Sequence, residues 1–150
     1  MPTTFSIIAT FAWALWLGGL GCLFLCVQVL FAADRATALD AAPIMFIAFE
    51  RYQLGLAAIC LLGAAAWWLS RPSRWLAGAF ALFALATIGA ILLPMTITGR
   101  MEDLRLRGEG GSAEFRQLHG RAMMVYTGES AALAAAGVML VLAGRRREAN

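Results

Sequence analysis

The sequence predicts an all-α integral membrane protein, a bundle of four transmembrane helices in one domain. Apolar residues make up 61% of the 150-residue chain, which is more than a soluble domain of this size can bury inside itself. Short polar segments at 34–40, 71–74 and 100–111 separate four long apolar stretches. Each stretch is long enough to cross a bilayer as a helix, so lipid is the expected partner of most of the surface.

The first apolar stretch predicts a helix over residues 5–33. No charged side chain occurs before Asp34, and residues 5–33 as a helix are about 44 Å long at ~1.5 Å per residue. A cleaved signal peptide is the competing interpretation. Signal peptides begin with a basic segment, which this stretch lacks, and its apolar run is about twice as long as the apolar part of such peptides. The run therefore indicates a membrane helix.

The second helix is predicted over residues 43–70. Residues 34–40 are expected to form a short polar connection, and Pro43 suits the first turn of the helix that follows. The segment 71–74, Arg-Pro-Ser-Arg, is typical of a tight turn with a proline stop. Helices 43–70 and 75–99 are therefore expected to form an antiparallel hairpin.

The third helix is predicted over residues 75–99, with a kink at Pro94 because proline removes a backbone donor. The polar segment 100–111 closes on two glycines, and Ser112 is a suitable N-cap. A fourth helix is then expected over residues 113–143, with a basic tail at residues 145–147.

Ionisable side chains occur inside the predicted spans and define a candidate polar cluster. With four spans, segments 34–40 and 100–111 lie on the same side of the membrane, and the cluster is expected in the half of the bundle on that side. Its members are Glu50, Arg51, Gln53, His119, Arg121, Tyr126 and Glu129. The five tryptophans fall in the other half, where some are expected to form an interfacial belt.

A lone charge at membrane depth costs at least about 2.5 kcal/mol, so the charged members need partners. We expect Arg51 or Arg121 to pair with Glu129, and His119 to pair with Glu50. Two interpretations stay open: a site for a ligand or a transported ion, and a salt-bridge clamp between the second and fourth helices.

Three residues are candidate ligands for a metal or a haem. His119, the single histidine, is a haem axial ligand, a proton relay or a polar cap at the interface. Cys22 and Cys26, four residues apart on one helix, either present two thiolates to a soft metal such as copper or belong to a ridge of small packing residues. The sequence leaves these alternatives open.

Three motifs carry a resemblance to a known family. They are Trp16-Leu17-Gly18-Gly19-Leu20, Phe49 with Tyr52, and Phe115-Arg116-Gln117-Leu118-His119-Gly120. In this order they resemble the domain-of-unknown-function 4149 proteins, a group that includes the animal transmembrane protein 205. The resemblance implies the four-helix layout and a hydrophilic third loop. Since the animal protein is associated with cisplatin resistance, it also implies an export or soft-metal role.

The first of these motifs is also similar to the start of the copper-resistance D domain and of HemJ-type haem-pathway oxidases. In HemJ-type proteins a histidine on the first helix is important for haem. Residues 5–33 contain no histidine here. The chain departs from the haem enzymes at this point, and His119 is the residue left for such a role.

The sequence favours a small, non-enzymatic multi-pass membrane protein whose polar cluster serves transport, ligand binding or helix locking. The alternatives are a haem- or redox-linked protein using His119, and handling of copper or platinum through Cys22 and Cys26. Nucleic acid is not an expected partner, because the arginines lie in loops and at helix ends. A homo-oligomer or a larger membrane complex is compatible with the pattern. The expected location is a bacterial inner membrane, with both termini in the cytoplasm.

Overall fold

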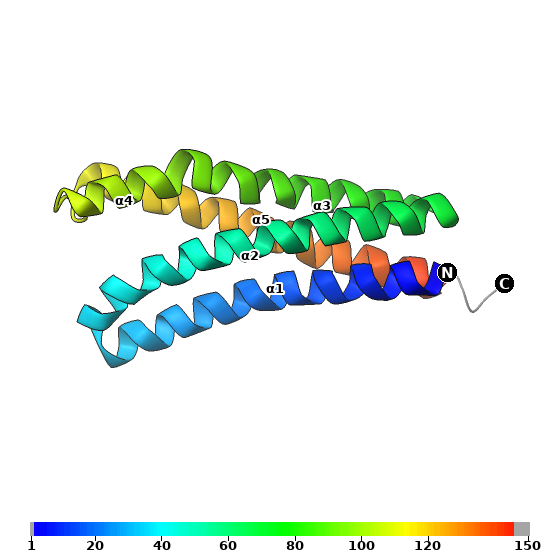
Figure 1. Cartoon of the computed structure of the whole chain (residues 1–150), viewed down its shortest axis with the longest axis horizontal. Coiled ribbons are helices and arrows are strands. Elements are labelled where there is room, and N and C mark those ends of the chain that lie inside the picture. The colour runs from blue at the N-terminus through cyan, green and yellow to red at the C-terminus, as the bar shows by residue number, and fades with distance from the viewer. Residues whose placement is uncertain (1, 146–150) are drawn as a thin grey trace.

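Four long helices form the protein (Figure 1), and the predicted all-α bundle is confirmed. The computed structural model describes residues 2–145, so Arg146 and Arg147 of the expected basic tail lie outside the described residues. The elements are α1 (Pro2–Ala33), α2 (Arg35–Ser70), α3 (Arg74–Leu93), the π-helical turn η1 (Pro94–Thr98), α4 (Gly99–Leu106) and α5 (Ala113–Arg145). The first two helices, the continuous rod from α3 to α4, and α5 are each long and apolar enough to cross a membrane.

The helices pack as two antiparallel pairs. α1 lies along α2 and α3 lies along α5, while the two pairs meet mainly through α2 and α3 and less through α1 and α5. The described termini lie at one end of the bundle, and the α1–α2 and α4–α5 connections lie at the other (Figure 1). At that second end the two pairs diverge. This divergence positions the cavity described below.

Close packing in the termini half of the bundle depends on a glycine opposite a tryptophan. The Trp13 ring lies so close to α5 that a Cβ on Gly137 would overlap its Cζ2 atom. In this position the Trp13 indole N–H donates to the Leu133 carbonyl at 2.7 Å. Small residues permit such close approach of membrane helices.

The predicted start of the second helix is wrong. α2 begins at Arg35, directly after α1, because Asp34 caps it: the Asp34 backbone is extended and its carboxylate accepts from the Ala36 N–H at 2.9 Å. Pro43 therefore lies inside the helix. Since proline has no N–H, the carbonyl four residues earlier, on Leu39, loses its helical donor.

The third helix extends beyond the predicted end at residue 99. Pro94 does not end it. The chain passes through the π turn η1 and continues as α4 to Leu106, so half of the expected polar loop is helical. A π turn inserts an extra residue into a helix and so changes which face the following side chains occupy.

The tryptophans do not all form an interfacial belt. Trp16 is completely buried, Trp67 is nearly so, and Trp68 is exposed. The division into a tryptophan half and a polar half fails at Trp16, which hydrogen-bonds to Glu129 inside the bundle.

The fit of Trp13 against α5 predicts different effects for two glycines of the same helix. Gly137→Ala should lower the free energy of unfolding by about 1–3 kcal/mol, because the new methyl group overlaps the Trp13 ring. Gly128→Ala is the matched control. It has open space around its Cβ position, and alanine is the better helix former by roughly 1 kcal/mol. Unfolding followed by circular dichroism in mild detergent measures both, and equal melting temperatures would contradict the packing described.

The Asp34 cap predicts a pH-dependent stability of the first turn of α2. Hydrogen bonds from the Thr37 hydroxyl and the Ala36 N–H hold the pKa of Asp34 below its usual value. The cap therefore stabilises the folded state at pH values above the ordinary pKa of an aspartate carboxyl. This stabilisation is lost as the pH falls through the lowered pKa of Asp34 in the folded protein. Asp34→Ala should speed hydrogen exchange of the Ala36 amide several-fold at neutral pH and have no effect once the wild-type carboxyl is protonated. Asp34→Asn should keep the cap and lose its pH dependence.

Candidate functional site

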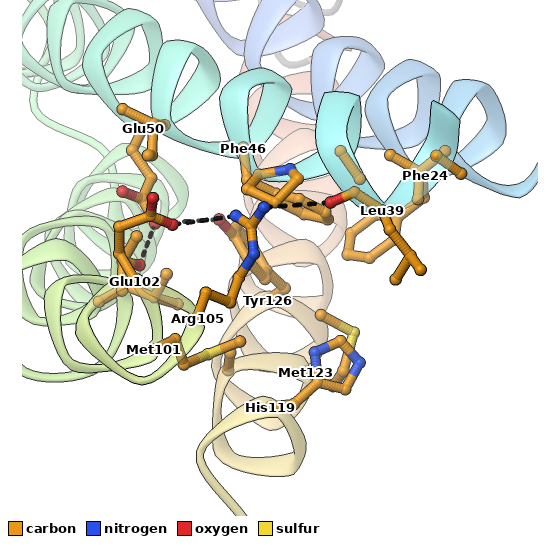
Figure 2. A pocket seen from close by; sticks show the side chains of 18 of the residues that line it. Phe24, Leu39, Phe46, Glu50, Met101, Glu102, Arg105, His119, Met123 and Tyr126 are labelled. Atoms are coloured by element: carbon orange, nitrogen blue, oxygen red, sulfur yellow. Dashed lines mark hydrogen bonds and ion pairs between the residues drawn. The ribbon is translucent and has the colours of Figure 1, made fainter. Parts of the chain in front are cut away.

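A cavity of about 310 Å³ lies between the two helix pairs at the end where they diverge. α1, α2, η1, α4 and α5 all contribute to its wall, together with the last residue of α3. Most of the wall is apolar. The polar lining residues are Gln28, Glu50, Thr98, Glu102, Arg105, His119 and Tyr126. Figure 2 shows Glu50, Tyr126 and Arg105 from three different helices converging on this space.

Glu50 supplies a buried carboxylate to the cavity wall. Its side chain is 4% exposed, and its Oε1 atom accepts hydrogen bonds from the Thr98 hydroxyl at 2.5 Å and the Tyr126 hydroxyl at 3.4 Å. The π turn places Thr98 on the side facing α2. Within the described residues Oε2 accepts no hydrogen bond, and this oxygen is not completely buried. One oxygen of Glu50 is therefore held by the protein and the other is available.

Three aromatic rings line the cavity together with this carboxylate. Phe24, Phe46 and Tyr126 come from α1, α2 and α5, and their ring centroids are 5.5–5.9 Å apart in pairs. Two of the three pairs are edge-on, which is a preferred geometry for aromatic contacts. The rings join the three helices around one apolar wall.

Arg105 crosses the mouth of the cavity from α4 to α2. Its Nη1 atom donates to Glu102 at 2.9 Å, and Nη2 donates to the Leu39 carbonyl at 3.2 Å (Figure 2). That carbonyl is the one that Pro43 leaves without a helical donor. A proline inside α2 thus creates the acceptor that receives the arginine.

A second hollow of about 300 Å³ lies beside α2 and η1. It shares Ile47, Glu50, Thr98 and Glu102 with the cavity. Arg51 and Pro94 are among its other lining residues. Glu50 is thus common to both spaces.

The remaining buried polar residues are Glu129 and Gln53. Glu129 is at the midpoint of α5, about 24 Å from either end at ~1.5 Å per residue. Its Oε1 atom accepts from the Trp16 indole N–H at 2.8 Å, while Oε2 is buried with no hydrogen-bond partner in residues 2–145. The Gln53 side chain is completely buried and neither of its polar atoms has a partner within the described residues. Such atoms are rare in folded proteins and are frequent at functional sites.

The expected charge pairs do not form. Arg51 and Arg121 are exposed, and no ion pair within residues 2–145 involves Glu50 or Glu129. His119 is exposed and lines the cavity, where its ring stacks on Phe115 with a centroid separation of 6.5 Å. The predicted pairs fail because Glu50 lies deeper in α2 than expected and because Arg51 and Arg121 are on the exposed surface. α2 starts eight residues earlier than predicted, so Glu50 is about four turns into it.

Cys22 and Cys26 lie on the exposed face of α1 with their sulfur atoms 3.9 Å apart, and Cys60 is buried. Among the described residues no three His, Cys, Asp or Glu side chains are grouped so that they could hold a metal ion. Neither cysteine of the pair lines the cavity. The soft-metal and haem interpretations stay predictions.

The predicted cluster does not include Trp16 or Arg105, and it gives Thr98 no partner. The sequence prediction places Trp16 with the other tryptophans in the opposite half of the bundle, and Arg105 in the polar segment 100–111. Two signals were available: Pro94 before Thr98 marks a local change of helical face, and Pro43 frees the Leu39 carbonyl. The partners of those groups were not readable from the sequence.

The fold and the site define an integral membrane protein, an all-α four-helix bundle with one internal carboxylate facing an apolar cavity. No family model, curated protein or solved structure matches the chain. The resemblance to the domain-of-unknown-function 4149 proteins therefore stays a prediction.

The bond between Trp16 and Glu129 predicts a specific loss of stability. Trp16→Phe keeps a buried ring but removes the donor, which should cost about 1–2 kcal/mol in the free energy of unfolding. Trp68→Phe is the control, since Trp68 is 39% exposed and should change little. In a double variant with Glu129→Leu the two losses should be less than additive, because both remove the same bond. Additive losses would show that the bond does not contribute.

Proposed function

We propose that this protein binds a hydrophobic small molecule, taken from the bilayer, in the cavity between its two helix pairs. The cavity carries the proposal: its volume of about 310 Å³ lies within the range of small-molecule sites, roughly 300–1,000 Å³. Its wall is apolar and aromatic with a few polar groups, which is the usual composition of such sites. Glu50 and Tyr126 would fix the orientation of the ligand.

The surroundings of the cavity support a role in binding more than a role in locking helices. A salt-bridge clamp needs opposite charges in contact, and Glu50 and Glu129 accept bonds from neutral Thr98, Tyr126 and Trp16 instead. The second hollow reaches the same Glu50. It would give a ligand a lateral route from the lipid, while Arg105 spans the mouth at the other side.

We also propose that both termini face the cytoplasm of a bacterial cell and that the cavity opens toward the outer side of its inner membrane. Support comes from the even number of spans, which puts both termini on one side, and from the compact basic segments of that side, Arg71 and Arg74 between α2 and α3 and Arg145 at the end of α5. The more numerous arginines toward the other end are interspersed with acidic residues. Basic residues favour the cytoplasmic side. A reporter fused to the C-terminus that is active only in the periplasm would overturn this orientation.

Photolabelling with an apolar aryl diazirine tests the proposed binding. We expect saturable labelling of the peptides that contain Phe24 and Phe46, reduced by excess of an unreactive analogue. Leu62 and Leu85 are exposed on the outer surface and should be labelled without saturation.

Two tryptophan substitutions on α2 provide the matched comparison. Ala42→Trp fills the cavity that Ala42 lines and should reduce saturable labelling at least about tenfold, equivalent to ~1.4 kcal/mol of binding free energy. Ala48→Trp, on the exposed face of the same helix, should leave it unchanged. Labelling that is equal in both variants, or never saturable, would rule out a binding cavity.

A further inference from the structure

The charges that line the cavity do not cancel. Glu102 and Arg105 neutralise each other through a 2.9 Å ion pair, which leaves Glu50 as the unpaired formal charge of the wall when it is ionised. Arg51, its neighbour in the chain, is exposed. A carboxylate without a cation beside it is costly at membrane depth, and either a proton or a bound cation removes that cost.

The aromatic rings point to the cation. Phe24, Phe46 and Tyr126 are packed against one another, with centroid separations of 5.5–5.9 Å, and line the same cavity as Glu50. The faces of aromatic rings attract organic cations, by about 2 kcal/mol or more when water is excluded. Neutral ligands gain only apolar contact from the rings, and the negative ring faces repel anions. The available Oε2 atom of Glu50 supplies the opposite charge.

We propose that the cavity binds a lipophilic cation, an ammonium or phosphonium centre carried on an apolar body, in exchange for a proton on Glu50. The proton on the carboxyl leaves to water as the cation enters, so the wall is neutral before and after binding. The apolar walls hold the body of the ligand, and the three rings with Glu50 hold its charge. This inference rests on the proposed function, since it names the class of ligand for the same cavity.

Other groups around Glu50 take part in the electrostatics of the exchange. The polar and charged groups that line the cavity or lie close to Glu50 come from each packed element: Gln28, Thr98, Glu102, Arg105, His119, Tyr126 and Glu129. Histidine side chains are the usual pH switches of proteins, so His119 has to be controlled separately.

A pair of probe ions with the same shape and opposite charge tests the proposal. Binding of tetraphenylphosphonium and tetraphenylborate is measured by equilibrium dialysis with the full-length protein in a maltoside detergent. We expect the phosphonium to bind and Glu50→Gln to weaken it at least about tenfold, or ~1.4 kcal/mol. Glu109→Gln removes the same charge from the exposed α4–α5 loop and should have no effect. Phe46→Leu should weaken phosphonium binding and leave any borate binding unchanged.

The pH dependence tests the exchange. Phosphonium affinity should fall as pH falls, because the proton competes for Glu50, and His119→Gln should retain this dependence. Loss of the dependence in His119→Gln, or a pH-independent affinity, would overturn the exchange at Glu50.

The outcomes separate the ligand class from the binding function. Equal binding of both ions, lost in Ala42→Trp, would overturn the cation inference and keep the cavity as a binding site. Binding unaffected by Ala42→Trp would overturn both.

The cationic centre could belong to a lipid headgroup or to a free molecule, and a competitor distinguishes these sources. A short-chain phosphatidylcholine that displaces the phosphonium would assign the site to a headgroup ammonium. Failure to displace it would assign the site to a freely diffusing lipophilic cation. Both results support a cation site at Glu50.

Discussion

Two indole N–H groups on α1 bind α5 and hold the two helix pairs together below the cavity. Trp13 donates to the Leu133 carbonyl and Trp16 donates to Glu129. Since the two pairs meet mainly through α2 and α3, these bonds add a second connection, between α1 and α5, at one level of the bundle. Toward the α1–α2 and α4–α5 connections the two pairs diverge (Figure 1). The cavity lies in this diverging end, beyond the two indole hydrogen bonds.

The second constraint is that the buried carboxylates have neutral partners. A buried ion pair would neutralise Glu50 within the protein, and the site would then have no remaining charge for a ligand. Hydroxyl and indole donors satisfy one oxygen of each carboxylate and leave its charge state to be set by a proton or a bound cation. Arg51 and Arg121 remain at the surface, where lipid headgroups and water can solvate them.

The prolines mark the places where the chain departs from simple helical prediction. Pro43 looked like a helix start and Pro94 like a kink near a helix end, yet both helices continue past them. In a membrane, a helix break costs more than a proline, because exposed backbone groups find no water. Both positions contribute to the cavity wall. The Leu39 carbonyl accepts a hydrogen bond from Arg105, and Thr98 of the π turn donates one to Glu50.

The sequence alone determined the number of helices and their membrane setting, and it placed Glu50, Gln53, Tyr126 and Glu129 inside the membrane spans. It could do so because apolar run length and the cost of charges in lipid are local properties of the chain. Only the tertiary structure decided the partners of these groups, the separation of Arg51 and Arg121 from them, and the cavity. Those depend on the rotation of each helix about its axis, which packing between helices fixes and hydropathy does not record.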